Sequence, residues 1–71
     1  MQKKNKHFFL NGKKYYTNKN KNLKDIINYF NYNSSLLIIE HNYIIRNKKD
    51  WSKIIIKNND KIEIITIVGG G

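Results

Sequence analysis

The residues with the clearest chemical potential are the last three of the 71-residue chain, Gly69, Gly70 and Gly71. Glycine inside a fold usually serves a turn with positive φ, but here no further element follows for a turn to join. A tail without side chains can instead thread a narrow channel and present its terminal carboxylate. A carboxylate becomes an acyl donor once ATP adenylates it, because a nucleophile can then displace AMP from an unhindered carbonyl. A frayed terminus or a cloning remnant is the alternative interpretation.

Other residues that could support chemistry are few and dispersed. His7 and His41 lie far apart in the sequence, and no pair of carboxylates has metal-site spacing, so we expect no metal ligands. The absence of cysteine excludes disulfides and thiol chemistry. Asp60 and Glu63 flank a turn and a strand, where a solvated surface is expected rather than acid–base catalysis. Five tyrosines are scattered over different segments, which favours partly buried aromatics over a platform for stacking bases: Tyr15, Tyr16, Tyr29, Tyr32 and Tyr43.

The charge of the chain restricts the classes of partner. The net charge is +9 at pH 7, from 14 lysines and arginines against five acids. Such a balance favours nucleic acid, anionic lipid or an acidic protein. However, all the basic residues except Arg46 are lysines spread along the chain, whereas nucleic-acid readers use arginine forks and clustered aromatics. We therefore expect a solvated lysine-rich surface without nucleic acid. No apolar stretch reaches the ~18 residues of a membrane span, so no membrane partner is expected.

The first half of the chain predicts a hairpin followed by a helix. Residues 7–11 and 14–17 favour two strands around Asn11-Gly12, the strongest two-residue hairpin signal. Asn22 is a good N-cap, and the carboxylate of Asp25 sits where the free N–H groups of a helix begin. Apolar residues then recur at i, i+3, i+4 and i+7, which is typical of an amphipathic helix ending near residues 31–35. This apolar stripe consists of Leu23, Ile26, Ile27 and Phe30.

The second half predicts further strands over residues 36–40, 43–46 and 61–68. Between them, residues 47–52 are expected to be irregular or briefly helical and to carry Trp51 as a plug for the end of the core. One helix across one mixed sheet is the economical way to bury these faces. With the first and last strands parallel at its centre, the sheet has the β-grasp arrangement of ubiquitin-like proteins. The expected class is α+β, with a mixed sheet of four to five strands, one main helix on one face and the other face open.

The end of the chain resembles a known family. Residues 60–71, with the sequence DKIEIITIVGGG, strongly resemble the C-terminus of the ThiS family, the sulfur carriers of thiamine thiazole biosynthesis. The similarity covers residues 8 to 71. Its upstream parts are Leu10-Asn11-Gly12, the run from Ile38 to Asn42, and Ile45-Arg46 with Trp51.

Three positions depart from the family pattern. Tyr43 and Asn59 stand where family members often have Gly, and Ile45 stands where they often have Pro. The chain is also more basic than is common in the family. None of these departures touches the tail, so they concern affinity for partners rather than the class of activity.

The resemblance implies a carrier and not an enzyme. A ThiF-like enzyme would convert the Gly71 carboxylate to an acyl-adenylate at the expense of MgATP. Sulfur from a cysteine desulfurase would displace AMP and leave a thiocarboxylate on Gly71, which a ThiG-like thiazole synthase would accept. Val68, Gly69 and Gly70 would form the tail that reaches these active sites. The carrier would bind no cofactor of its own.

A docking face is expected on the open side of the sheet. Alternation along the last strand directs Ile62 and Ile64 toward the helix. It directs Ile65 and Ile67 toward the open face. A phenylalanine on the neighbouring first strand should face the same way and extend an apolar patch toward the tail. The residues expected to dock partners are Phe9, Arg46, Ile65 and Ile67.

Two alternatives remain open at this point. One is another β-grasp carrier, either the sulfur carrier of molybdopterin synthesis, which normally has a longer chain, or a ubiquitin-like modifier. The other is a small basic nucleic-acid-binding module, which would leave the glycine tail unexplained.

The chain is expected to divide into three parts. These are a basic N-terminal leader at residues 1–6, expected to be disordered, a β-grasp domain at residues 7–68, and a flexible tail at residues 69–71. The N-terminus has neither a long apolar region nor the pattern of a transit peptide. We therefore expect the protein to work where it is made, in the cytoplasm, or in the plastid stroma if it is encoded in a plastid.

Overall fold

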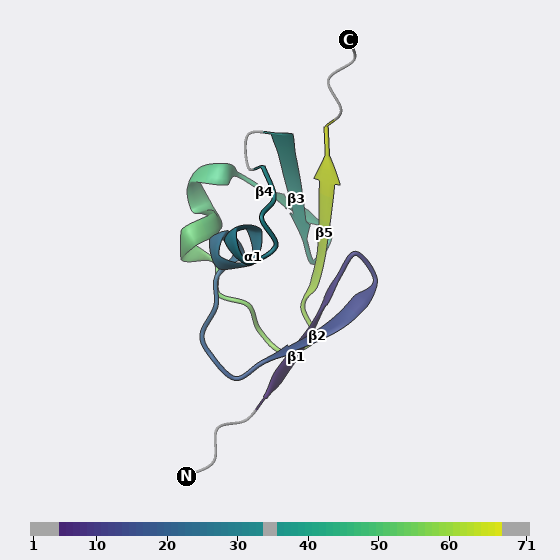
Figure 1. The fold of residues 1–71 in the computed structure, drawn as a ribbon, viewed down its shortest axis with the longest axis vertical. Helices are drawn as coiled ribbons and strands as arrows, with labels where there is room; N and C mark the ends of the chain where they lie inside the picture. Colours follow the sequence, from purple (N-terminus) through teal and green to yellow (C-terminus); the bar gives the residue numbers. More distant parts are fainter. Residues whose placement is uncertain (1–4, 34–35, 68–71) are drawn as a thin grey trace.

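A computed structural model describes residues 5–33 and 36–67 and shows a five-stranded mixed sheet with one α-helix packed on one face (Figure 1). The strand order across the sheet is β2-β1-β5-β3-β4. This arrangement agrees with the expected α+β class and with a central last strand. In chain order, the elements are β1 (Lys6–Leu10), β2 (Lys13–Thr17), α1 (Leu23–Tyr29), β3 (Leu37–His41), β4 (Ile44–Arg46), the 3₁₀ helix η2 (Lys48–Lys53) and β5 (Lys61–Thr66).

Both hairpins turn through two residues with left-handed backbone. In the β1–β2 turn, φ is 50° at Asn11 and 82° at Gly12, as the Asn-Gly signal predicts. The β3–β4 turn uses Asn42 at 50° and Tyr43 at 69°. Tyr43 therefore occupies, with a large side chain, a conformation that favours glycine. Asn59, the other departure from a family glycine, also has positive φ, at 70°.

Helix α1 begins where the sequence predicts. The Asn22 side chain accepts a hydrogen bond from the Asp25 N–H at 2.8 Å, and the Asp25 carboxylate accepts one from the Asn22 N–H at 2.9 Å. This reciprocal pair is a capping box, which satisfies two N–H groups at the helix start. The helix ends at Tyr29, with Phe30 as its C-cap. The apolar stripe faces the sheet, and only its last member, Phe30, is incompletely buried.

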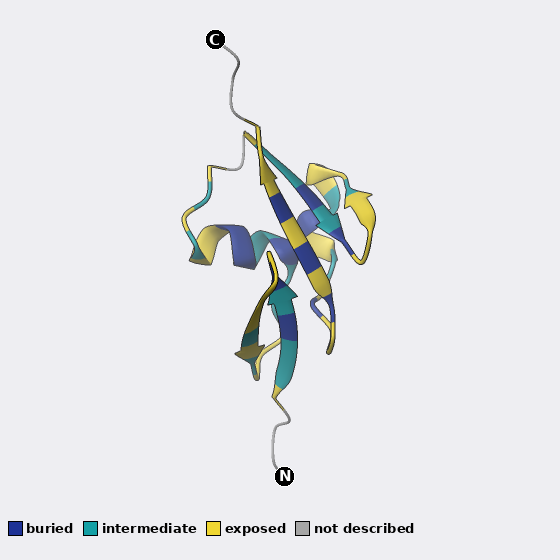
Figure 2. Cartoon of the chain, turned by 90° about the vertical axis from the view of Figure 1, so that its right-hand side faces the viewer, coloured by how far each residue is buried: buried dark blue, intermediate teal, exposed yellow. Residues whose placement is uncertain are grey.

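Strand β5 lies between the two halves of the sheet. It runs parallel to β1, with Phe9 opposite Lys61, and antiparallel to β3, with Ile38 opposite Ile65. Buried and exposed residues alternate along β5 (Figure 2). Ile62 and Ile64 are buried, so the prediction that these two residues face the helix is confirmed.

Trp51 closes the core at the side of η2. Its side chain is 1% exposed, and its indole Nε1 donates a hydrogen bond to the Arg46 carbonyl at 3.1 Å. The predicted plug is therefore confirmed, with its polar N–H satisfied. The buried apolar residues that form the core are Phe8, Leu10, Leu23, Ile26, Ile27, Ile39, Trp51, Ile56, Ile62 and Ile64.

The ends of the domain differ slightly from expectation. Strand β1 starts at Lys6, one residue before the predicted strand, and the Lys6 Nζ donates a hydrogen bond to the Asn20 Oδ1 at 2.9 Å. Lys6 therefore belongs to the sheet, while residues 1–4 of the expected leader lie outside the described residues. Strand β5 ends at Thr66 rather than Val68, which also lies outside them. Among the described residues, no helix is both long and apolar enough to cross a membrane.

Candidate functional site

The four residues predicted to form the tail, Val68, Gly69, Gly70 and Gly71, lie outside the described residues. What the structure places is the point from which they continue. The Ile67 N–H donates a hydrogen bond to the Leu36 carbonyl at 2.7 Å. The chain is therefore held at the sheet, beside β3, up to the residue that precedes Val68.

An apolar patch occupies the open face at the end of β5. Ile65 and Ile67 are each 48% exposed, on the face away from α1. Ile38 lies directly opposite Ile65. Continuing the register one residue beyond the Leu37–Thr66 pair places Leu36 opposite Ile67. We call these four residues, Leu36, Ile38, Ile65 and Ile67, the C-terminal patch. Two of them come from the β3 side and were not predicted as site residues.

Phe9 faces the open side of the sheet but lies apart from this patch. It pairs with Lys61, so Glu63 separates it from Ile65 along β5. The Phe9 ring instead lies nearly perpendicular to the His7 ring, with centroids 6.0 Å apart, and its centroid lies 5.7 Å from the Lys14 Nζ. The structure therefore brings Ile65 and Ile67 together without Phe9.

Arg46 also lies apart from the C-terminal patch. It pairs with Ile39, a core residue, so its side chain belongs to the face that carries α1. Its Nε is buried without a hydrogen-bond partner among the described residues, and its carbonyl holds Trp51. The position of Arg46 supports a role in packing around Trp51 more directly than a role on the open face.

Two acidic residues occupy opposed positions beside the patch. Glu40 on β3 lies directly opposite Glu63 on β5, on the same open face as Ile38 and Ile65. Like charges in directly opposed positions destabilise a sheet. The pairing concentrates two of the five acids of a strongly basic chain next to the C-terminal patch. The sequence shows both residues, but only the β3–β5 register reveals that they are paired.

Asp60 is buried, which corrects the expectation of a solvated carboxylate. Its Oδ2 accepts hydrogen bonds from the Lys57 N–H and the His41 Nε2, both at 2.8 Å, and its Oδ1 accepts one from the Asn42 side chain at 3.0 Å. Burial is the largest influence on the pKa of Asp60 and raises it, but the hydrogen bonds from His41, Asn42 and Lys57 together bring the pKa below its ordinary value.

This network joins the β3–β4 turn to the turn before β5. The Asn42 Oδ1 accepts a hydrogen bond from the Lys61 N–H at 2.8 Å. The Asn42 side chain therefore bonds both to the Asp60 carboxylate and to the main chain of Lys61. His41 reaches Asp60 through Nε2, while its buried Nδ1 has no partner among the described residues. The contacts of His41 and Asn42 hold one turn against the other, and the Lys57–Asp60 bond closes the turn before β5, so the cluster has a structural task.

The described part of the chain offers no assembled catalytic or metal site. Across residues 5–33 and 36–67, no group of three or more His, Cys, Asp or Glu side chains could hold a metal ion. What the structure does assemble is an apolar surface, flanked by two carboxylates, at the end of the strand that leads into the glycine tail. This arrangement is suited to docking rather than to bond-making by the domain itself.

Comparisons with known proteins agree with this architecture. The model of the ThiS family matches residues 9–71. A crystal structure of the thiamine biosynthesis protein ThiS from Geobacter metallireducens superposes with a TM-score of 0.78, at 18% identity, over 92% of this chain and 99% of that one. This likeness confirms the predicted β-grasp fold.

Curated relatives match along most of their length. A ycf40 protein of Trieres chinensis is 64% identical over 66 residues, which cover 93% of this chain and 90% of the relative. A ycf40 protein of Porphyra purpurea is 35% identical over the whole of both chains.

Proposed function

The chain belongs to the ThiS family, the small sulfur carriers of thiamine biosynthesis, which are not enzymes, and from this premise we propose that it carries sulfur for thiazole formation as a thiocarboxylate on Gly71. A ThiF-like enzyme adenylates the Gly71 carboxylate with MgATP and releases pyrophosphate. A persulfide that carries sulfur from a cysteine desulfurase then attacks the carbonyl and displaces AMP, and a thiol reduces the resulting acyl disulfide to leave the thiocarboxylate. A ThiG-like thiazole synthase receives the sulfur. The carrier binds no cofactor, since MgATP is used by the activating partner.

The observation that carries this proposal is that the C-terminal patch includes Ile67, the residue directly before the predicted tail. Two partners must grip the same carrier and deliver the same three glycines to an active site. An exposed apolar surface, held at the start of the tail by the Ile67–Leu36 hydrogen bond, provides a binding surface that both partners can use. Full burial of an exposed side chain of this size contributes about 1.5–3 kcal/mol, and Ile65 and Ile67, each 48% exposed, retain roughly half of that for docking. The patch therefore supplies part of the affinity for either partner.

The Glu40–Glu63 pair adds a charge requirement to that grip. Like charges at directly opposed positions of a sheet repel each other, and a cationic side chain of the partner would relieve this repulsion between Glu40 and Glu63 on docking. The rest of the chain is basic. We therefore expect partner surfaces that combine an apolar centre with a lysine or arginine placed over this pair.

The relatives bear on where this chemistry occurs. Their shared name, ycf40, supports the plastid stroma over the cytoplasm as the working compartment. Detection of the protein in a stromal fraction would test this choice.

The direct test is the intact mass of the carrier after incubation with a ThiF-like enzyme, MgATP and a sulfur source. The expected mass gain is that of one oxygen replaced by sulfur, located on Gly71 by fragmentation. Deletion of Gly71, or replacement of Gly70 with Trp, should abolish both the mass gain and ATP–pyrophosphate exchange. The circular dichroism spectrum should stay unchanged, because neither residue belongs to the described core. Normal pyrophosphate exchange by the chain without Gly71 would refute the proposal.

A further inference from the structure

The outer edge of β2 pairs with no strand in the part of the chain that the structure describes. Within that part, β2 is the terminal strand of the sheet on the β1 side, bonded to β1 alone. Leu10 and Lys13 flank the two-residue turn, a position where opposed residues exchange hydrogen bonds. Because hydrogen-bonded and non-bonded pairs alternate along an antiparallel ladder, the N–H and C=O groups of Lys14 and Tyr16 point outward. This edge therefore presents a short row of main-chain donors and acceptors.

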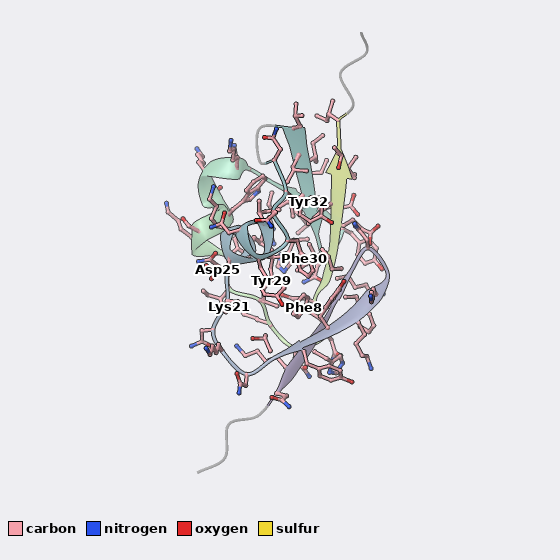
Figure 3. All side chains as sticks on the ribbon, in the orientation of Figure 1. Phe8, Lys21, Asp25, Tyr29, Phe30 and Tyr32 are labelled. Carbon is pink, nitrogen blue, oxygen red and sulfur yellow. The ribbon has the colours of Figure 1, made fainter. Side chains whose placement is uncertain are left out.

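A cleft runs between this edge and helix α1. It has a volume of about 230 Å³ and is lined mainly by apolar and aromatic side chains. Phe8, Tyr29 and Phe30 lie between the helix and the β1–β2 hairpin (Figure 3). The Tyr15 ring forms the wall on β2. Its centroid lies 5.9 Å from that of the Phe8 ring, on which it stacks, and 5.3 Å from that of the Phe30 ring, which it meets edge to face. The cleft is smaller than the roughly 300–1,000 Å³ of small-molecule pockets, so a few aliphatic side chains fit it better than a cofactor.

Two lysines lie at or next to the cleft. Lys21 lines it beyond the end of β2, and the Lys13 Nζ lies 5.7 Å from the Tyr15 ring at the hairpin end. The one acid in the lining is Asp25, whose carboxylate is engaged in the capping box of α1. The cleft is thus mainly apolar and aromatic, with Lys21 in its lining and Lys13 next to the Tyr15 ring.

We propose that the groove between β2 and α1 binds an extended segment of an acidic partner protein by strand addition to β2. The main chain of the segment pairs with Lys14 and Tyr16. Its alternate side chains enter the cleft against Tyr15 and Phe30, and acidic residues on either side of them meet Lys13 and Lys21. Strand addition gives affinity through the main chain and specificity through pockets for alternate side chains.

A second copy of this chain is a poorer occupant than an acidic partner. The edge carries Lys13 and Lys14, a second copy would add the same positive charge to it, and such edge lysines discourage pairing between like edges. An acidic segment instead neutralises them, and the net charge of +9 accelerates its encounter with the carrier.

The groove is separate from the surface used in the proposed sulfur transfer. β2 lies at one edge of the sheet, whereas the C-terminal patch lies on β5 and β3 and on the opposite face from α1. A carrier docked through the patch can therefore hold a second protein through the groove. The inference goes beyond sulfur transfer and can fail independently of it.

The test uses the full chain and a fluorescein-labelled peptide with four alternating valines and isoleucines between pairs of Asp and Glu. Binding is measured by fluorescence anisotropy at low and high salt and mapped by amide shifts in NMR. Peptides with serine in place of the apolar residues, or with lysine in place of the acids, serve as matched probes. We expect the acidic apolar peptide alone to bind, with protection from hydrogen exchange appearing at the Lys14 and Tyr16 amides.

Two variants separate the main-chain and charge components. Tyr16→Pro removes an outward N–H at an edge position where proline is tolerated and should raise the Kd roughly five- to tenfold. The double change Lys13→Glu and Lys21→Glu should raise the Kd about tenfold at low salt and less at high salt. The matched control, Lys48→Glu with Lys49→Glu on η2, makes the same change in net charge and should leave the Kd nearly unchanged.

Several results would overturn the proposal. These are no binding of the acidic apolar peptide to the wild-type chain, equal binding by the charge-reversal variant and its control, amide shifts confined to the C-terminal patch, or a dimer joined through β2 in sedimentation. If Tyr16→Pro unfolds the domain, the charge-reversal pair decides alone. A folded Tyr16→Pro variant should still form the Gly71 thiocarboxylate at the wild-type level. The sulfur-carrier proposal and the groove proposal are therefore tested independently.

Discussion

Replacing Asp60 with Asn should destabilise the domain by about 2–3 kcal/mol. The carboxylate accepts three hydrogen bonds, two at Oδ2 from Lys57 and His41 and one at Oδ1 from Asn42. An amide keeps one accepting oxygen. If that oxygen takes the place of Oδ2, the new NH₂ group faces the NH₂ group of Asn42 and one bond is lost. The remaining bonds also weaken, because their acceptor is no longer charged. A hydrogen bond to a charged group contributes about 1.5–3 kcal/mol to stability.

The measurement is urea unfolding of the wild-type and Asp60→Asn chains at pH 7, with the same m-value expected for both. A domain of this size has only a few kcal/mol of stability, so the midpoint should fall strongly. A matched control is Asp50→Asn, since Asp50 lies in the first turn of η2 outside the network. A loss below about 0.5 kcal/mol for Asp60→Asn, within the range of ordinary surface changes, would refute the account of the network.

The same carboxylate makes stability depend on pH in a definite direction. Burial raises the pKa of Asp60, but the hydrogen bonds from His41, Asn42 and Lys57 lower it below its unfolded value. A depressed folded pKa contributes stability above the unfolded pKa, and this contribution is lost as the pH falls through the folded pKa. The wild-type chain should therefore lose more stability than Asp60→Asn between pH 7 and about pH 3. A difference between the two chains that stays constant over this range would contradict the assigned direction.

Three further substitutions test the open face and the strained turn. Ile65→Asp should weaken binding to ThiF-like and ThiG-like partners roughly ten- to a hundredfold, measured by calorimetry, with little change in Tm. The matched control is Ile44→Asp, on the edge strand and the other face of the sheet. Equal losses of affinity from both substitutions would exclude the patch as the docking surface. Tyr43→Gly should raise stability by about 1 kcal/mol, seen as a higher Tm, because it removes a side chain at φ 69°; an unchanged Tm would mean that the Tyr43 contacts with Lys61 offset the strain. Glu63→Gln should raise stability by about 0.2–1 kcal/mol and weaken partner binding, and unaltered binding would remove the Glu40–Glu63 pair from the docking surface.

Local signals in the sequence predicted the local structure well. Asn11-Gly12 and the Asn22–Asp25 capping box lie where they were expected, because each depends on backbone geometry within a few residues. Trp51 was also predicted correctly, since a large aromatic in a short irregular segment has little else to pack on. These features need no knowledge of which strands are neighbours.

Features that depend on register between distant strands could not be predicted in the same way. Alternation along β5 gave the face of Ile65, but only the pairing with β3 adds Ile38 to the C-terminal patch. The parallel register of β1 and β5 moves Phe9 beside Lys61 and away from Ile65. Burial of Asp60 was missed because its donors include His41 and Asn42, which are remote in sequence and come close only when two turns meet.

The central position of β5 has a consequence for the synthesis of the protein. Without β5, the β1–β2 hairpin and the β3–β4 hairpin have no strand that joins them, and β5 is the last of the described strands to leave the ribosome. Pairing of β1 with β5 also closes a long loop, which is slow compared with local pairing. A nascent chain that stops before β5 therefore stays unfolded and open to proteolysis. Each folded molecule has been translated through the strand that leads into the glycine tail, so folding itself selects against carriers truncated before that strand.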